Sequence, residues 1–204
     1  MHLVDTAPKG VQLINEKGVV HDGTEYPLDV LIYATGFQWM GTGTFNTITG
    51  RKGETLAQKW ERQGTSTFLG LHTKDFPNLF IISGPQGGGG SFNFTTALEE
   101  HGDYVVWCMG HMRQNGLDIC DIDEAAENDY VKHCYDSDVA TAPLRDCVTY
   151  YNGEGTARPG SLAYYGTEWG KRRRTAQETL APYKFQSTGY KWGSTGGAAP
   201  MSRL

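Results

Sequence analysis

Apolar and polar residues alternate near the start of the chain in a way that predicts short antiparallel strands. Residues 11–14 and 19–21 are rich in valine, leucine and isoleucine, and the polar segment 15–18 between them ends in glycine. Short apolar runs joined by a turn with glycine are typical of β-hairpins. We therefore expect a β-meander, which ends where Gly23 and Pro27 interrupt the chain.

Two later segments are almost wholly apolar, which is typical of parallel strands buried on both faces of a sheet. They are residues 29–34 and 79–82, and each runs into a turn that contains glycine, at 34–37 and 83–86. In an open α/β sheet, ligands bind outside the carboxyl ends of the strands, where glycine lets the backbone approach them closely. The two turns therefore predict two halves of one cofactor or substrate crevice.

The longest helix is predicted over residues 95–115, where apolar residues recur every three or four positions. Thr96 and Glu99 are spaced as a capping box at its start, and Asn115 with Gly116 suits its end. The N–H groups of its first turn then face the crevice and favour an acceptor oxygen or a partial negative charge. A second helix is expected over residues 122–136.

Glycine, proline and aromatic residues alternate in the C-terminal part, so we expect a lobe of loops held together by tyrosines and Trp169. The basic run 171–174 is interpreted as a solvated face. The whole pattern predicts an α/β fold with a β-meander, buried parallel strands, two main helices and this lobe. We expect a single domain over residues 1–185 and a loose tail rich in glycine and serine over 186–204.

Composition narrows the class of protein. The 204 residues are 38% hydrophobic, with a net charge of −5 and a mean hydropathy of −0.48. These values predict a soluble globular protein and make nucleic acid an unexpected partner. No apolar run is long enough to span a membrane, and the four cysteines form no C-x-x-C pair and follow no signal peptide. We therefore expect reduced thiols and a cytoplasmic location, without a membrane partner.

Two familiar kinds of site are not expected. The G-x-G-x-x-G fingerprint of dinucleotide-binding turns is missing, since Asn46 stands where a third glycine would follow Gly41 and Gly43. His101 and Cys108 share a helical face with a second histidine, but such stripes are more typical of core packing than of metal binding, so no metal is predicted.

Several segments occur together in an order and spacing that point to a known family. They are DVLIYATGF at 29–37, FLGL at 68–71, FPNLFIISGPQ at 76–86, SFN at 91–93, a helix with Glu99 and His101, and a later piece over 144–185. This order resembles the C-terminal part of type I Baeyer-Villiger monooxygenases, from about residue 5 to residue 185.

The resemblance implies a flavoprotein that binds FAD and NADPH and inserts oxygen beside a ketone carbonyl, giving an ester or lactone. In that family an NADPH domain interrupts the FAD domain, and this chain is similar to the segment that completes the FAD domain. The resemblance therefore implies a partial FAD-binding, Rossmann-like domain. The resemblance implies cofactor-binding roles for Ala34, Thr35, Gly36, Gly84, Pro85, Asn93, Phe94 and Thr95, and substrate-binding roles for Gln86, Gly89, Gly90, Ser91, Phe92 and Phe94. It identifies no catalytic residue, and the family's nucleotide-binding turns and its arginine have no counterpart here.

Three functions stay open at this point. The chain is the C-terminal part of a Baeyer-Villiger monooxygenase, incomplete alone and completed by an N-terminal partner chain. Alternatively it is a flavin-independent isomerase, dehydratase or cyclase that acts on a small carbonyl compound in the former crevice. The third hypothesis is a non-catalytic assembly module, whose exposed strand edges favour a homo-oligomer or a partner.

Overall fold

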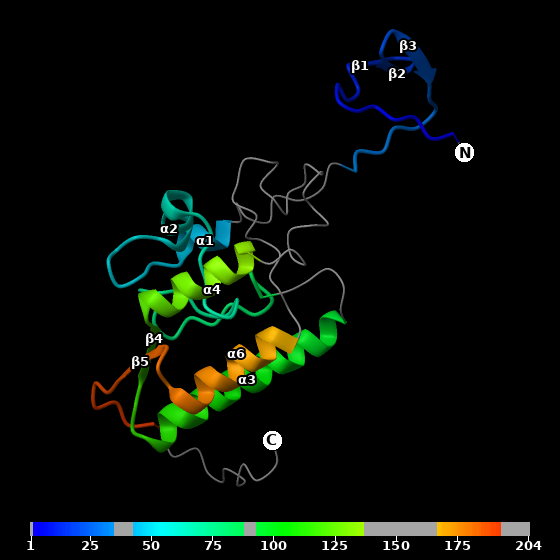
Figure 1. The fold of residues 1–204 in the computed structure, drawn as a ribbon. Coiled ribbons are helices and arrows are strands. Elements are labelled where there is room, and N and C mark those ends of the chain that lie inside the picture. The colour runs from blue at the N-terminus through cyan, green and yellow to red at the C-terminus, as the bar shows by residue number, and fades with distance from the viewer. Residues whose placement is uncertain (1, 35–42, 88–92, 137–166, 193–204) are drawn as a thin grey trace. The chain divides into compact units, whose positions relative to one another are not determined.

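The computed structural model of the chain describes residues 2–34, 43–87, 93–136 and 167–192. Helices and small antiparallel sheets make up the fold, which confirms the α/β class (Figure 1). The chain divides into two compact units, Met1–Phe37 and Gln38–Leu204.

The first unit is built on a three-stranded meander. Strands β1 (Leu13–Asn15), β2 (Gly18–His21) and β3 (Thr24–Pro27) pair antiparallel in that order. The turn between β1 and β2 is closed by the side chain of Asn15, whose Oδ1 accepts hydrogen bonds from the N–H groups of Lys17 and Gly18 at 2.9 and 3.0 Å. The predicted meander is confirmed, with a third strand where the sequence indicated only an interruption.

The expected parallel strands are not found in the described residues. Residues 29–34 form no strand, and the side chains of Val30, Ile32 and Tyr33 are 70–81% exposed. Residues 79–82 likewise form no strand. A strand covered on both faces needs neighbouring strands to pair with its backbone, and β1, β2 and β3 in the first unit pair only with one another. Residues 29–34 and 79–82 are therefore not the buried parallel strands that the sequence predicted, and the described part of the chain does not confirm a Rossmann-like sheet.

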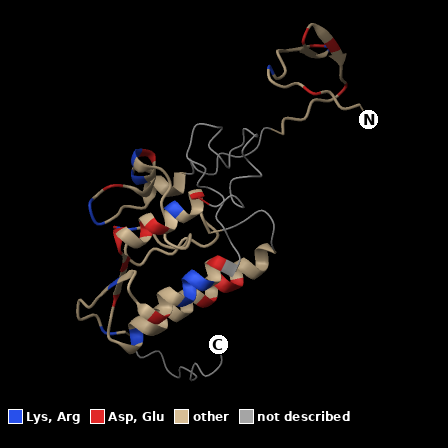
Figure 2. Cartoon of the chain, viewed as in Figure 1, with Lys and Arg blue, Asp and Glu red and all other residues tan. Residues whose placement is uncertain are grey.

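The second unit combines helices with a two-stranded sheet. Its elements are α1 (Gly43–Thr47), α2 (Leu56–Gln63), α3 (Phe94–Gln114), β4 (Ile119–Ile122), α4 (Glu124–Asp136), α6 (Thr167–Thr179) and β5 (Tyr183–Gln186). Strands β4 and β5 pair antiparallel, with Ile122 opposite Tyr183. Acidic and basic residues are interspersed along α2, α4 and α6 (Figure 2).

The core of this unit lies between α3, α4, α6 and the sheet. Its largest fully buried side chains include Trp169, Tyr104 and Tyr130, one from each of these three helices. Trp169 packs on the His101 ring with 5.4 Å between centroids, which fixes α6 against α3. A smaller cluster of buried apolar residues gathers around α2, made of Leu56, Trp60 and Phe76. Both helices predicted from the sequence are confirmed, with α4 starting two residues late because 119–122 is a strand.

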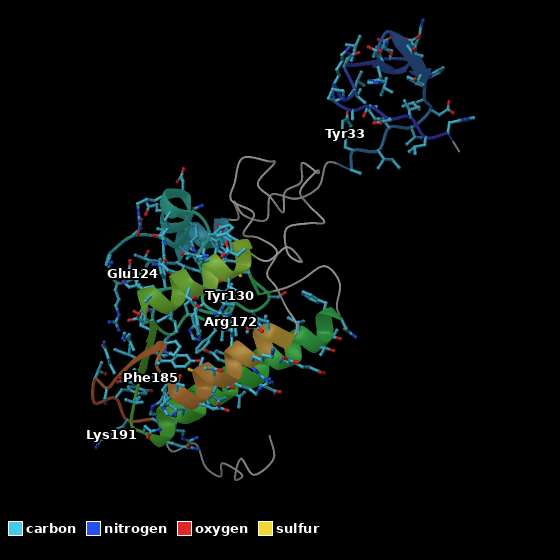
Figure 3. The ribbon with its side chains drawn as sticks, viewed as in Figure 1. Tyr33, Glu124, Tyr130, Arg172, Phe185 and Lys191 are labelled. Carbon is cyan, nitrogen blue, oxygen red and sulfur yellow. The ribbon has the colours of Figure 1, made fainter. Side chains whose placement is uncertain are left out.

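The expected lobe of loops lies partly outside the described residues, over 142–166, and its later part forms the helix α6. Trp169 is buried as predicted, but it lies on a helix that also carries the basic run. Arg172 Nη1 of α6 donates to Asp129 Oδ2 of α4 at 2.7 Å, next to the buried ring of Tyr130 (Figure 3). Part of the basic run therefore joins two helices.

Residues beyond β5 also contact the second unit. Thr188 and Tyr190 donate their backbone N–H groups to the Asp118 carboxylate at 2.8 and 3.2 Å. Trp192 Nε1 donates to the carbonyl of Leu117 at 2.7 Å. Ordered contacts thus extend past residue 185, where the sequence predicted the start of the tail.

A buried ion pair ties α2 to α4. Lys59 Nζ lies 3.0 Å from Glu127 Oε1 and also donates to the Thr73 hydroxyl at 2.7 Å and to the Lys74 carbonyl at 2.9 Å. Glu127 Oε1 further accepts from the Thr73 hydroxyl and from the Lys74 N–H, each at 2.9 Å. Burial lowers the pKa of Lys59, whereas the charge of Glu127 raises it. Two charges at 5% and 2% exposure are therefore paired and fully surrounded by hydrogen-bond partners.

Within the described residues, no helix is both long enough and apolar enough to cross a membrane. The same part of the chain holds no group of three or more histidine, cysteine, aspartate or glutamate side chains arranged for a metal ion.

Candidate functional site

The turn that follows residues 79–82 is tightly packed. A Cβ atom on Gly84 would lie 2.2 Å from Ile81 Cγ2, and one on Gly70 would lie 2.0 Å from the Cα of Gly87. Gly70 has a φ of +71°, in the left-handed region that glycine adopts at little cost. The turn 84–87 is thus fixed against the loop 68–72 by glycines at the points of closest approach.

Gln86 is the residue that holds this turn in place. Its side chain is fully buried, and its Oε1 accepts from the N–H and the hydroxyl of Thr67 at 2.9 and 2.7 Å. Its Nε2 donates to the Thr65 carbonyl at 3.1 Å, and its own carbonyl accepts from Tyr130 Oη at 2.8 Å. The polar groups of Gln86 are therefore engaged inside the protein, which supports a structural role beside the predicted contact with substrate.

The start of α3 is capped by a residue other than the one predicted. Asn93 is the N-cap, and its Oδ1 accepts from the N–H and the hydroxyl of Thr95 at 3.0 and 2.6 Å. The predicted box of Thr96 and Glu99 is wrong, because the helix starts three residues earlier than that box requires. Asn93 satisfies one of the N–H groups that a helix leaves unpaired at its start.

Phe94 adds an apolar surface to this helix end, since its side chain is 59% exposed. Asn93 and Thr95 on either side of it are exposed as well. N–H donors beside an exposed aromatic ring suit a flat group that carries acceptor oxygens, such as a flavin ring. These residues therefore fit the cofactor that the family resemblance implies.

His101 links the turn to α3. The N–H of Ser83 donates to His101 Nδ1 at 3.3 Å, so the turn and the helix are joined one residue before Gly84. Burial lowers the pKa of His101 to about 4, with a further lowering by Arg173 and an opposing effect of Glu100. The ring is therefore neutral near pH 7 and acts as an anchor. The sequence placed His101 on the buried face but gave no sign of this hydrogen bond.

A second buried histidine forms a hydrogen-bonded chain with two tyrosines. His72 Nε2 lies 2.9 Å from Tyr104 Oη, which lies 2.8 Å from Tyr183 Oη. Burial lowers the pKa of His72 to about 3 and raises the pKa values of both tyrosines. All three groups are uncharged near neutral pH, so the chain fixes the loop, α3 and β5 to one another.

The other predicted site residues fall into two groups. Ala34 belongs to the first unit and is exposed, whereas the Gly84–Gln86 turn and the start of α3 belong to the second. Outside the described residues lie Thr35, Gly36, Gly89, Gly90, Ser91 and Phe92. The structure therefore joins the turn and the helix start in one unit, through Ser83 and His101.

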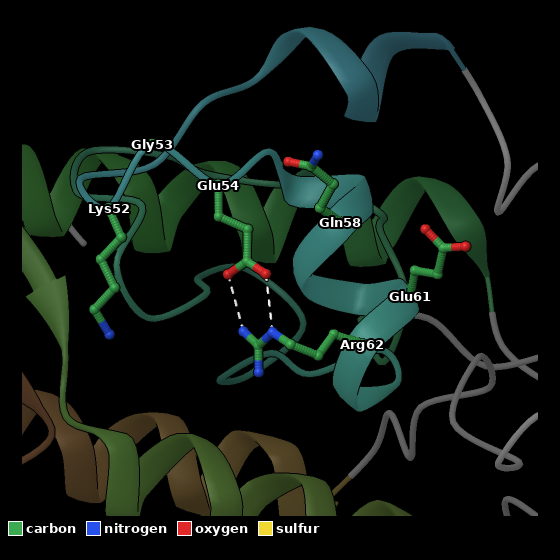
Figure 4. Close-up of a pocket in the computed structure, with 6 residues that line it drawn as sticks. All are labelled: Lys52, Gly53, Glu54, Gln58, Glu61 and Arg62. Atoms are coloured by element: carbon green, nitrogen blue, oxygen red, sulfur yellow. Dashed lines mark hydrogen bonds and ion pairs between the residues drawn. The ribbon is translucent and has the colours of Figure 1, made fainter.

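Two open pockets lie away from these residues. One, of about 640 Å³, is lined by Lys52, Gly53, Glu54, Gln58, Glu61 and Arg62 (Figure 4). Arg62 closes its floor through a two-point ion pair with Glu54, in which both N···O distances are 2.9 Å. The other, of about 390 Å³, lies beside Asp118, Tyr190 and Trp192. Neither contains a predicted site residue, and the first is a solvated patch of charged side chains.

The sequence of the chain is similar to those of fungal and bacterial monooxygenases. It is 37% identical over 176 residues to the Baeyer-Villiger monooxygenase peniC of Penicillium patulum, a match that covers 81% of this chain and 28% of that protein. It is 33% identical over 197 residues to a Baeyer-Villiger monooxygenase of Streptomyces coelicolor, covering 88% of this chain and 32% of that protein. No protein-family model matches the chain.

The fold of the chain is similar to solved structures of monooxygenases. The complex of OTEMO with FAD and NADP aligns with a TM-score of 0.72 and 26% identity, over 91% of this chain and 35% of that one. The polycyclic ketone monooxygenase from Thermothelomyces thermophila aligns with a TM-score of 0.69 and 26% identity, over 91% of this chain and 32% of that one.

The chain spans about a third of the length of the relatives that it matches. The similarity nevertheless extends over most of its own residues. Over this length the chain belongs to the family of Baeyer-Villiger monooxygenases and corresponds to a C-terminal portion of such an enzyme.

Proposed function

We propose that the chain supplies the C-terminal portion of the FAD domain of a Baeyer-Villiger monooxygenase. The whole enzyme uses FAD and NADPH to insert oxygen beside the carbonyl of a ketone, which gives an ester or a lactone. The observation that carries this proposal is the 37% identity to a named Baeyer-Villiger monooxygenase over 81% of the chain. The comparisons do not favour a flavin-independent carbonyl enzyme or a non-catalytic module.

In that reaction, the residues of this chain bind the flavin and the ketone and orient them toward each other. Bound FAD supplies the activation of molecular oxygen for transfer to the ketone. The first turn of α3 would offer N–H donors to a flavin oxygen, and the exposed side chain of Phe94 would pack against the ring. The turn at Gly84 and Pro85 forms a wall that Gln86 and His101 hold rigid through the bonds described above. A rigid wall keeps water away from the reacting groups.

The remaining assignments rest on the family. We propose that Ala34, Thr35 and Gly36 lie near both cofactors in the complete enzyme. We propose further that Gly89, Gly90, Ser91 and Phe92 line the ketone site together with Phe94. The free thiols of Cys108 and Cys120 support a reducing compartment, and we place the enzyme in the cytoplasm.

A chimera tests the proposal. The matching segment of the Streptomyces coelicolor relative is replaced by this chain, and the purified protein is examined for flavin absorbance, ketone-dependent NADPH consumption and ester or lactone product. A coloured chimera that forms the oxygenated product supports the proposal. A colourless, folded chimera overturns it.

A pair of glycine substitutions sharpens this test. In the chimera, Gly84→Ala is expected to reduce flavin content and turnover, because the added methyl group meets Ile81. Gly43→Ala is the control, since a Cβ there meets no described atom within 4 Å. Equal flavin content in the two variants would remove the Gly84 turn from the proposed site.

A further inference from the structure

The face of α3 that points away from the core carries an ordered stripe of residues. Positions spaced alternately by four and three residues lie along one side of a helix, as in a coiled coil. On α3 this stripe is Glu99, Gly102, Val106, Met109 and Arg113, which we call the outer stripe. Val106 and Met109 are each 45% exposed, although both are large apolar side chains. The opposite face of α3 buries Tyr104 and Cys108, so the outer stripe is not needed for the core.

Gly102 lies in the middle of this stripe and of a 21-residue helix. Glycine in the interior of an exposed helix is less stable than alanine. A Cβ atom on Gly102 would meet nothing within 4 Å among the described residues. The contacts of the described chain therefore do not require glycine here. Glycine instead leaves room for a surface from another molecule to approach the helix backbone closely.

The charged ends of the stripe are placed symmetrically. Glu99 stands seven residues before Val106 and Arg113 stands seven residues after it. Both side chains are exposed, and within the described part of the chain neither belongs to an ion pair. Two such helices packed antiparallel bring opposite charges together at both ends, whereas parallel packing opposes like charges.

We propose that the outer stripe is a self-association surface, on which α3 packs antiparallel against α3 of a second copy of this chain. A two-fold axis passes near Val106, as in isologous dimers. Met109 lies against the partner's Gly102, and Glu99 pairs with the partner's Arg113. The proposal concerns a surface apart from the flavin-facing end of α3 and does not depend on the proposed function.

The size of the stripe sets the strength of this dimer. A helix of 21 residues is about 31 Å long, and a single pair of helices buries less surface than a standard protein interface. The dimer is therefore weak and depends on protein concentration. Sedimentation velocity over a range of concentrations measures this directly.

Val106→Glu is the first variant. It places like charges together at the two-fold axis and is expected to raise the dissociation constant at least about tenfold. Val11→Glu is the matched control, because Val11 is also half-exposed, at 48%, and lies in the other unit. A monomeric wild-type chain, or equal dissociation constants for the wild type and Val106→Glu, would overturn the proposal.

A charge exchange tests the orientation. Glu99→Arg and Arg113→Glu should each weaken association, since each places like charges together, and the double variant should restore it. Restoration supports the antiparallel dimer even if Val106→Glu fails to fold. If the double variant stays as weak as the single variants, the antiparallel arrangement is wrong. All three proteins are checked for unchanged helix content by circular dichroism.

Discussion

At the scale of single residues, the strongest test of the fold is the buried pair of Lys59 and Glu127. Lys59→Met leaves Glu127 as a buried charge without its counter-ion, which is expected to cost about 3–5 kcal/mol of unfolding free energy. Lys52→Met is the matched control, because its ion pair with Asp75 is largely exposed and is worth at most about 1 kcal/mol. Urea denaturation measures the unfolding free energy of both variants. Equal losses of unfolding free energy would show that burial does not determine how much these two ion pairs contribute to stability.

His72 predicts how stability depends on pH. Its pKa is lowered to about 3 in the folded protein by burial, against 6.5 for an ordinary histidine. Below about pH 6.5 the unfolded chain therefore binds a proton that the folded chain does not, and the free energy of unfolding falls as pH falls. The full contribution is present above that pH and is lost progressively toward about pH 3.

The variant His72→Gln removes the titrating group and keeps a hydrogen-bond acceptor for Tyr104. Between about pH 7 and pH 5, above the range of most carboxyl groups, the wild type should lose about 2 kcal/mol more than this variant. Urea denaturation at several pH values gives both curves. Parallel curves would mean that the pKa of His72 is the same in the folded and the unfolded chain.

For some residues of the candidate site, the sequence predicted the position along the chain but not the contacts of the side chain. The pattern placed Gln86 at a turn after an apolar segment, and the structure confirms the turn. Whether its side chain faces a ligand or the protein depends on Thr67 and Tyr130, which are distant in the sequence. Local spacing carries no information about such contacts, and the anchoring role of Gln86 was therefore missed.

At the scale of elements, the sequence and the structure give different N-cap residues for α3, and stability measurements can decide between them. Asn93→Ala removes the N-cap and should lower the free energy of unfolding by about 1 kcal/mol. Thr96→Ala, at the residue that the sequence indicated as the cap, should change it by less than about 0.5 kcal/mol. Asn93→Ser retains a capping oxygen and serves as a control. Thermal denaturation followed by circular dichroism would contradict this assignment if the Thr96 variant were the less stable one.

Helices with one apolar face were predictable, whereas elements that depend on distant partners were not. α3 and α4 show helical spacing in the sequence, and both form. α6 carries charged residues and Gly170 along most of its length, with Trp169 and Ala176 as its buried contacts, so no apolar stripe announces it. Segment 29–34 has the composition of a buried strand, but strand pairing depends on neighbours that the described residues do not supply.

At the scale of the whole molecule, the exposed apolar residues of segment 29–34 predict different behaviour alone and in a complete enzyme. Ile32 is 81% exposed, so Ile32→Lys should leave the unfolding free energy of the isolated chain within about 0.5 kcal/mol of the wild type. If the proposed function is right, the same segment completes a buried sheet in the chimera. A lysine there would be buried without a partner, and the chimera should lose most of its bound flavin.

Leu3→Lys is the matched control, because Leu3 belongs to the same unit and is 93% exposed. It should leave both the isolated chain and the flavin content of the chimera unchanged. The two variants are compared by the flavin absorbance per protein of the chimera and by urea denaturation of the isolated chain. If Ile32→Lys had no effect in either protein, segment 29–34 would be a surface segment in both, and the strand that the sequence pattern indicates would not form in the assembled enzyme.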